Sequence, residues 1–120
     1  MGYNKYIETG ANVKIYKSKQ YEADYKKKIV GKHLYKEIDR IQNIEELILD
    51  MDDLKELLLN PLSIVYGIDQ KKGNLREFFT AKVNGKIRLV MRPVGDYPYD
   101  QIKIEEINFI EIDNKHYGEG

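Results

Sequence analysis

Residues 73–92 contain two runs of alternating residues that meet at Asn84-Gly85. Asparagine and glycine both tolerate the positive φ angles of a two-residue type I′ turn, so these residues predict a tight antiparallel hairpin. On the first expected strand Phe79, Ala81 and Val83 share one face, and on the second strand Ile87, Leu89 and Met91 alternate with Arg88, Val90 and Arg92. A row of cations lies on one face, which a hairpin that only covers a core does not require.

The expected turn also decides which residues of the two strands lie opposite each other. A two-residue turn pairs Lys82 with Ile87 and Ala81 with Arg88. Residues that pair across a ladder share a face, so Lys82 and Arg88 would then lie on opposite faces. A bulge or a three-residue loop would instead bring these two cations to the same face.

The charges cancel over the whole chain, which has 20 lysines and arginines and 20 aspartates and glutamates. They are grouped, however: residues 1–42 hold ten cations and five anions, and residues 62–92 hold seven and two. Residues 43–61 hold one cation and six anions, and residues 93–120 hold two and seven. Such blocks can give a small domain one basic and one acidic face, so net neutrality does not exclude a polyanionic partner.

Length and composition limit the class of protein. A chain of 120 residues predicts a single domain, here with a short N-terminal extension (1–12) and a polar C-terminal tail (114–120). The absence of cysteine excludes disulfides and cysteine-based zinc sites, and two isolated histidines predict no metal site and no cofactor. No apolar leader and no membrane-spanning run are present, so we expect a soluble, cytoplasmic protein.

The first half of the chain predicts one strand and two helices. Residues 13–17 alternate as a strand, and Ser18 can cap the helix that follows. Gly31 interrupts the apolar spacing of that helix, which is therefore one kinked helix or two short ones. Asn43 and Glu46 have the form of a capping box, which predicts the start of the second helix.

The second half predicts the rest of a sheet. The second helix ends at Asn60-Pro61, and residues 62–72 fit either a strand or an extended loop. Residues 101–112 form a further strand with a bulge or bend between Ile104 and Ile107. The predicted fold is α+β: strand, helix, helix and then an antiparallel meander, with the helices packed on one face of the sheet.

Three segments in this order resemble the RelE/ParE toxin superfamily, in particular its RelE- and HigB-like members. Residues 14–28, with Ser18 and Lys26-Lys27-Lys28, are similar to the opening strand and first helix, and residues 57–61 resemble the end of the second helix. Residues 73–90 resemble the core signature, in which a glycine and a leucine precede an aromatic strand, a turn and an arginine in an apolar strand. The agreement in order and spacing carries the resemblance.

The resemblance implies the toxin of a type II toxin–antitoxin system, with an antitoxin protein, the ribosome and mRNA as its partners. RelE-like members are endoribonucleases that cleave mRNA in the ribosomal A site, whereas ParE-like members poison DNA gyrase. In the cleavage reaction the 2′-hydroxyl attacks the adjacent phosphate. The protein must therefore help to remove one proton, deliver another to the leaving 5′-oxygen and stabilise the developing negative charge.

The resemblance also assigns residues to these tasks. Arg88 falls at the strand arginine of the family, and a guanidinium pairs with phosphate oxygens in two places. Lys82 matches a basic position on the preceding strand, and His116 and Tyr117 lie near the family's C-terminal catalytic or base-stacking residues. We expect four further cations to bind RNA: Arg76, Lys86, Arg92 and Lys115.

Two departures leave an alternative open. Thr80 stands where RelE-like members often carry a lysine, and the chain ends soon after Tyr117. The alternative is a non-nucleolytic member that acts as a ParE-like gyrase poison or a protein-binding module. In that case Arg88 is a sheet arginine paired with a carboxylate such as Glu105 or Glu106.

Overall fold

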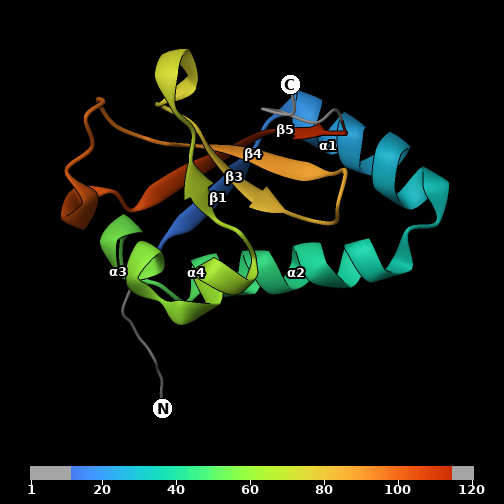
Figure 1. Cartoon of the computed structure of the whole chain (residues 1–120), viewed down its shortest axis with the longest axis horizontal. Coiled ribbons are helices and arrows are strands. Elements are labelled where there is room, and N and C mark those ends of the chain that lie inside the picture. Colours follow the sequence, from blue (N-terminus) through green and yellow to red (C-terminus); the bar gives the residue numbers. More distant parts are fainter. Residues whose placement is uncertain (1–11, 115–120) are drawn as a thin grey trace.

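The two alternating runs form neighbouring strands of a five-stranded sheet, with helices packed against it (Figure 1). The computed structural model describes residues 12–114. The strands lie in the order β1-β5-β4-β3-β2, and all neighbours are antiparallel except β1 and β5, which are parallel. Their bounds are β1 Lys14–Lys17, β2 Asp69–Gln70, β3 Phe79–Lys82, β4 Arg88–Pro93 and β5 Glu106–Asp113.

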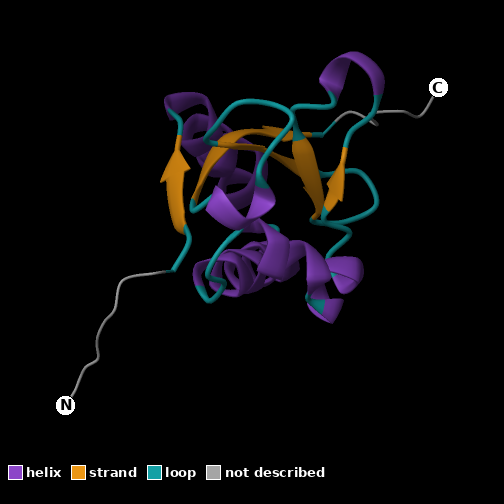
Figure 2. Cartoon of the chain, turned by 90° about the vertical axis from the view of Figure 1, so that its left-hand side faces the viewer, coloured by secondary structure: helices purple, strands orange, loops and turns teal. Residues whose placement is uncertain are grey.

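The helices lie largely in a separate layer from the sheet. Figure 2 shows the sheet as one layer with α2, α3 and α4 gathered beneath it. The α-helices are α1 Lys19–Asp24, α2 Tyr35–Leu49, α3 Leu54–Leu59 and α4 Pro61–Val65. Short 3₁₀ turns cover Gly73–Leu75 and Gln101–Lys103. The α+β class and the packing of helices on the sheet are thus confirmed.

The first helical segment is interrupted, as the sequence predicted. The Ser18 hydroxyl accepts a hydrogen bond from the Tyr21 N–H (2.9 Å), which confirms the predicted cap. After α1 the chain continues as a π-helical turn (Tyr25–Ile29) and a 3₁₀ turn, and it reverses at His33, whose φ is 58°. A Cβ at Gly31 would lie 3.0 Å from the Lys26 carbonyl oxygen, so glycine permits the tight turn here.

The predicted start of the second helix is wrong. Asn43 is an exposed residue in the middle of α2, which begins at Tyr35. Its buried stripe runs without interruption through Ile41, Ile44, Leu47 and Ile48, so burial along the whole stripe outweighs the local capping pattern.

Asn60-Pro61 ends a helix, as predicted, and starts another, but the predicted second helix is wrong as a single element, because α2 ends at Leu49 and the separate helix α3 begins at Leu54. The Asn60 side chain accepts a hydrogen bond from the Leu62 N–H (2.9 Å), and Pro61 occupies the first turn of α4. Part of the ambiguous segment 62–72 is therefore helix α4, and only β2 within it is strand.

The last strand is shorter than predicted, and its irregularity lies elsewhere. Met91 pairs with Phe109 and Val90 with Glu111, so Ile110 is the extra residue, and the expected bulge between Ile104 and Ile107 is wrong. β5 begins only at Glu106, because residues 101–103 form the 3₁₀ turn.

The core lies between the helices and one face of the sheet. Tyr21 of α1 packs edge-to-face on Phe109 of β5 with 5.3 Å between ring centroids. The largest fully buried side chains of the core are Tyr21, Phe109, Ile29, Ile41, Ile44, Ile48, Leu54, Leu57, Leu89, Met91, Ile112 and Val13. No helix within residues 12–114 is both long and apolar enough to cross a membrane.

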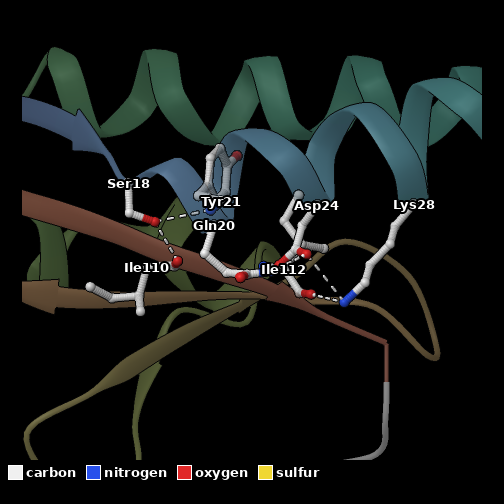
Figure 3. Close-up of polar contacts among 7 residues, drawn as sticks. All are labelled: Ser18, Gln20, Tyr21, Asp24, Lys28, Ile110 and Ile112. Atoms are coloured by element: carbon white, nitrogen blue, oxygen red, sulfur yellow. Dashed lines mark hydrogen bonds and ion pairs between the residues drawn. The ribbon is translucent and has the colours of Figure 1, made fainter.

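Helix α1 completes the edge of β5 where its partner strand stops. β1 pairs with β5 only as far as Phe109. Beyond that point, side chains of the first helical segment bind the backbone of β5 (Figure 3): Ser18 donates to the Ile110 carbonyl and Lys28 donates to the Ile112 carbonyl at 2.9 Å. Asp24 accepts from the Ile112 N–H. The backbone polar groups at this edge are thus paired without another strand.

Candidate active site

The hairpin that carries Arg88 closes through a three-residue loop, Asn84–Lys86, so the predicted two-residue type I′ turn is wrong. Among the described residues neither Asn84 nor Gly85 has a positive φ. Instead, Asn84 Oδ1 accepts hydrogen bonds from the backbone N–H groups of Lys86 and Ile87, both at 2.8 Å. The asparagine shapes the loop with its side chain rather than with a left-handed backbone.

This loop places the two predicted catalytic cations next to each other. Lys82 pairs directly with Arg88, rather than with Ile87, so both lie on the face of the sheet that points away from the helices. We call this the outer face; its residues on β3 and β4 include Thr80, Lys82, Arg88 and Val90. Lys82 is exposed and Arg88 is half-buried.

Arg88 is held by the loop that precedes it. Its Nη1 donates to the Asn84 carbonyl at 2.9 Å and to the Ile87 carbonyl at 3.4 Å. The Asn84 side chain in turn donates to Glu37 Oε2 of α2 at 2.8 Å. A chain of contacts from α2 through Asn84 therefore positions the guanidinium.

A second contact with α2 holds the strand that carries Lys82. Arg40 donates from Nε to the Lys82 carbonyl (2.7 Å) and from Nη2 to the Val65 carbonyl (3.0 Å). Its guanidinium also lies 5.0 Å from the centre of the Tyr66 ring. The end of β3, the end of α4 and helix α2 are thus joined at one arginine.

The outer face is hollowed beside these cations. A cavity of about 120 Å³ is lined by Lys71, Leu75, Phe78, Thr80, Val90, Ile110 and Glu111. Thr80, the departure from the family pattern, is buried at its wall. The sequence pattern did not single out Lys71 or Glu111. The alternation along β5 would have placed Glu111 on this face, but the bulge at Ile110 interrupts that alternation.

The acidic residue across from Arg88 is Asp113, not Glu105 or Glu106. In the β4–β5 register Arg88 pairs with Asp113. Glu106 lies at the far end of β5, seven residues away, which is roughly 23 Å along a strand. The predicted alternative of an Arg88 pair with Glu105 or Glu106 is therefore wrong.

Cations from the first helical segment lie at the same end of the sheet as Arg88. Lys28 Nζ reaches the carbonyl of Ile112, the residue before Asp113. Lys26 and Lys27, its neighbours in the π-helical turn, are exposed. Lys86 is exposed in the loop itself. Lys26, Lys27 and Lys86 thus add positive charge at this end of the sheet, whereas Lys28 is paired with Asp24.

The other two predicted RNA-binding residues lie at the opposite end of the hairpin. Arg92 forms an ion pair with Glu77 (2.9 Å), and this hydrogen bond raises the pKa of the Arg92 guanidinium above its usual value. Arg76 stacks over Tyr97 at 5.4 Å. Nearby, the Tyr99 hydroxyl donates to the Glu77 carbonyl, and burial raises the pKa of Tyr99. The structure thus divides the predicted cations between two sites.

Three predicted site residues, Lys115, His116 and Tyr117, lie outside the described residues. The described residues end at Asn114, which follows Asp113, the residue of β5 that pairs with Arg88.

The fold is similar to those of several solved bacterial toxins. YafQ from E. coli is 16% identical over 91% of this chain and 100% of its own, with a TM-score of 0.59. YafQ in the E. coli DinJ-YafQ toxin-antitoxin complex is 17% identical over 91% of this chain and 99% of its own, with a TM-score of 0.58. A YoeB/ParE toxin from Agrobacterium tumefaciens is 12% identical over 87% of this chain and 100% of its own (TM-score 0.55). No family model matches the sequence, and no curated protein matches it.

Proposed function

We propose that this chain, which has the fold of the RelE/ParE toxins, is the toxin of a toxin–antitoxin pair and cleaves RNA on the outer face of its sheet. The observation that carries the proposal is the pairing of Lys82 with Arg88 beside the cavity on that face. Two cations at adjacent strand positions match the charge of a phosphate that gains negative charge during cleavage.

Arg88 is the residue that we propose for phosphate stabilisation. Two backbone carbonyls hold its Nη1, so the guanidinium is oriented before a substrate arrives. Lys82 would add a second positive charge to the same phosphate. Lys26, Lys27 and Lys86 would attract the negatively charged RNA backbone toward this end of the sheet. An RNA chain in the ribosome also carries this backbone charge.

Proton transfer requires a base and an acid near that phosphate. Glu111 lines the cavity and pairs with Val90, two positions from Arg88, so its carboxylate is a candidate to accept the 2′-hydroxyl proton. His116 is a candidate acid, because it follows Asp113, the residue that pairs with Arg88, by only three positions in the sequence. Tyr117 would stack on a base.

The partner that we propose is an antitoxin protein, and the site of action is the translating ribosome in the cytoplasm. Two of the similar solved structures are DinJ-YafQ complexes, the first described as toxin-antitoxin. The same class of partner would keep this chain inactive until the antitoxin is lost.

Induced expression tests the proposal. We expect growth arrest and new 5′ ends in translated messages, mapped by primer extension. Arg88→Ala should abolish both while the protein stays folded. Lys103→Ala is the matched control, because it removes a solvent-exposed cation far from the cavity. Intact messages together with altered plasmid supercoiling would refute RNA cleavage and favour gyrase as the target.

A further inference from the structure

The two short helices α3 and α4 present large aliphatic side chains to solvent. Ile64 is 85% exposed and Leu59 is 73% exposed, and Leu62 and Val65 are exposed beside them. We call these four residues the α3–α4 ridge; Figure 1 shows the two helices next to each other, joined at Asn60. Several exposed aliphatic side chains on two neighbouring short helices of a small domain are typical of a protein-binding site.

The ridge is held in place by polar contacts rather than by its own burial. The Asn60 side chain caps α4, and the buried Ser63 hydroxyl donates to the Leu57 carbonyl. Every other residue of α4 is exposed, so the fold does not need aliphatic side chains at positions 62, 64 and 65. A rigid support that displays unneeded apolar groups indicates selection for contact with another molecule.

We propose that the α3–α4 ridge docks an amphipathic helix of a protein partner, with basic residues at the end that lies over the start of α3. An aliphatic stripe on such a helix matches the ridge. The basic end is required by the acidic residues that precede and open α3: Asp52 and Glu56 are exposed there, and Asp53 is half-buried. Lys55 is the one cation between residues 50 and 65.

The ridge adjoins the candidate active site. Arg40 donates to the carbonyls of both Val65 and Lys82, and the Lys82 N–H donates to the Tyr66 carbonyl at 2.8 Å. A partner seated on α4 therefore lies next to the end of β3 that carries Lys82, and a partner that extends around this edge of the sheet would restrict the approach of RNA to the outer face. This inhibitory consequence rests on the proposed function, whereas docking itself does not.

A labelled 14-residue peptide tests the docking. Its leucines follow the i, i+3, i+4 spacing of one helical face, and lysines occupy one end; the control peptide has the same composition in scrambled order. Fluorescence anisotropy with the full chain should give binding of the first peptide only. Ile64→Ser should weaken it about tenfold or more, as loss of a central aliphatic contact does. Ile102→Ser, which changes an aliphatic residue that is 58% exposed elsewhere, should leave it unchanged.

Competition with labelled single-stranded RNA separates the two proposals. The peptide should displace RNA from the native chain but not from Ile64→Ser. Absence of RNA binding with peptide binding intact would refute the RNA function and leave the docking site standing. Three results would overturn the docking site. The first is peptide binding that neither Ile64→Ser nor Leu59→Ser weakens. The second is a native dimer that either variant converts to a monomer, and the third is tighter peptide binding by Ile7→Asp. The last two would assign the ridge to a second copy or to residues 1–11.

Discussion

Asp24 accepts a hydrogen bond from the backbone N–H of Ile112 at 2.9 Å, although 88 residues separate the two (Figure 3). The Asp24 carboxylate is almost fully buried and also receives Gln20 Nε2 at 2.7 Å and Lys28 Nζ at 3.5 Å. It therefore connects the first helix to the strand that ends beside Arg88. This contact has consequences for stability that can be measured.

Asp24→Ala should lower the free energy of unfolding by about 1–3 kcal/mol, because it leaves the buried Ile112 N–H without an acceptor. Asp24→Asn keeps an acceptor oxygen for the Ile112 N–H but loses the acceptor for Gln20 and the charge interaction with Lys28, so its effect should be smaller than that of Asp24→Ala. Urea denaturation measures both values. Glu22→Ala, on the exposed side of α1, is the control; an equal loss for Glu22→Ala and Asp24→Ala would contradict the role of Asp24.

Asn84→Ala should reduce RNA cleavage about tenfold or more with little change in substrate affinity, because the loop that holds Arg88 loses its side-chain hydrogen bonds. Single-turnover cleavage kinetics separate the rate of the chemical step from binding. Gly85→Ala is the matched control in the same loop, since a Cβ there meets nothing within 4 Å and its φ is not positive. If both variants cleave at the native rate, Asn84 does not position Arg88.

Tyr21 should make the protein sensitive to alkali. Burial raises the pKa of its phenol well above the ordinary value, with smaller contributions from Glu45 and Tyr25. Above about pH 10 the unfolded chain loses this proton while the folded chain keeps it. Stability is therefore fully present below pH 10 and falls as the pH rises further, by up to about 1.4 kcal/mol per pH unit.

Tyr21→Phe should remove this part of the alkaline loss. At pH 7 the variant should be as stable as the native chain, because Tyr21 Oη has no hydrogen-bond partner among the described residues. Thermal melts from pH 7 to 11 measure the difference, with Tyr35→Phe, a largely exposed tyrosine, as the control. Equal alkaline slopes for native protein and Tyr21→Phe would show that another group titrates.

Arg88 and Arg92 should differ in their contribution to RNA binding. Arg92 is already paired with Glu77, whereas Arg88 pairs with Lys82, two positions along β4 from Val90 in the cavity wall. We expect Arg88→Ala to lower the salt dependence of single-stranded RNA affinity by about 0.7 in the log–log slope, the value for one phosphate contact. Arg92→Ala should leave the slope almost unchanged. A larger change for Arg92→Ala would move the RNA path to the other end of the hairpin.

The sequence predicted the elements whose causes are local. Ser18 caps α1 through the N–H three residues along, and the alternation on both sides of Asn84 gives β3 and β4. The RelE/ParE toxin fold was predicted correctly for the same reason, since the order of local patterns carried the resemblance. The capping pattern at Asn43 misled because its neighbours continue a buried stripe.

The turn shows where a local pattern has two physical outcomes. Asn-Gly permits a left-handed two-residue turn, but here the Asn84 side chain satisfies two backbone N–H groups and contacts Glu37, so the three-residue loop forms. That choice moved Lys82 opposite Arg88. Periodicity could not decide it, because Glu37 is 47 residues away in the chain.

By itself, then, the sequence determined the α+β class and the two strands of the hairpin, because residue spacing acts over a few neighbouring residues. Only the tertiary structure decided that Lys82 faces Arg88, that Glu111 and Lys71 share a cavity with Thr80, and that Asp24 completes the edge of β5. Those contacts join segments distant in sequence. They form because buried backbone groups must be paired and apolar faces covered across the whole chain, a requirement that no single segment expresses.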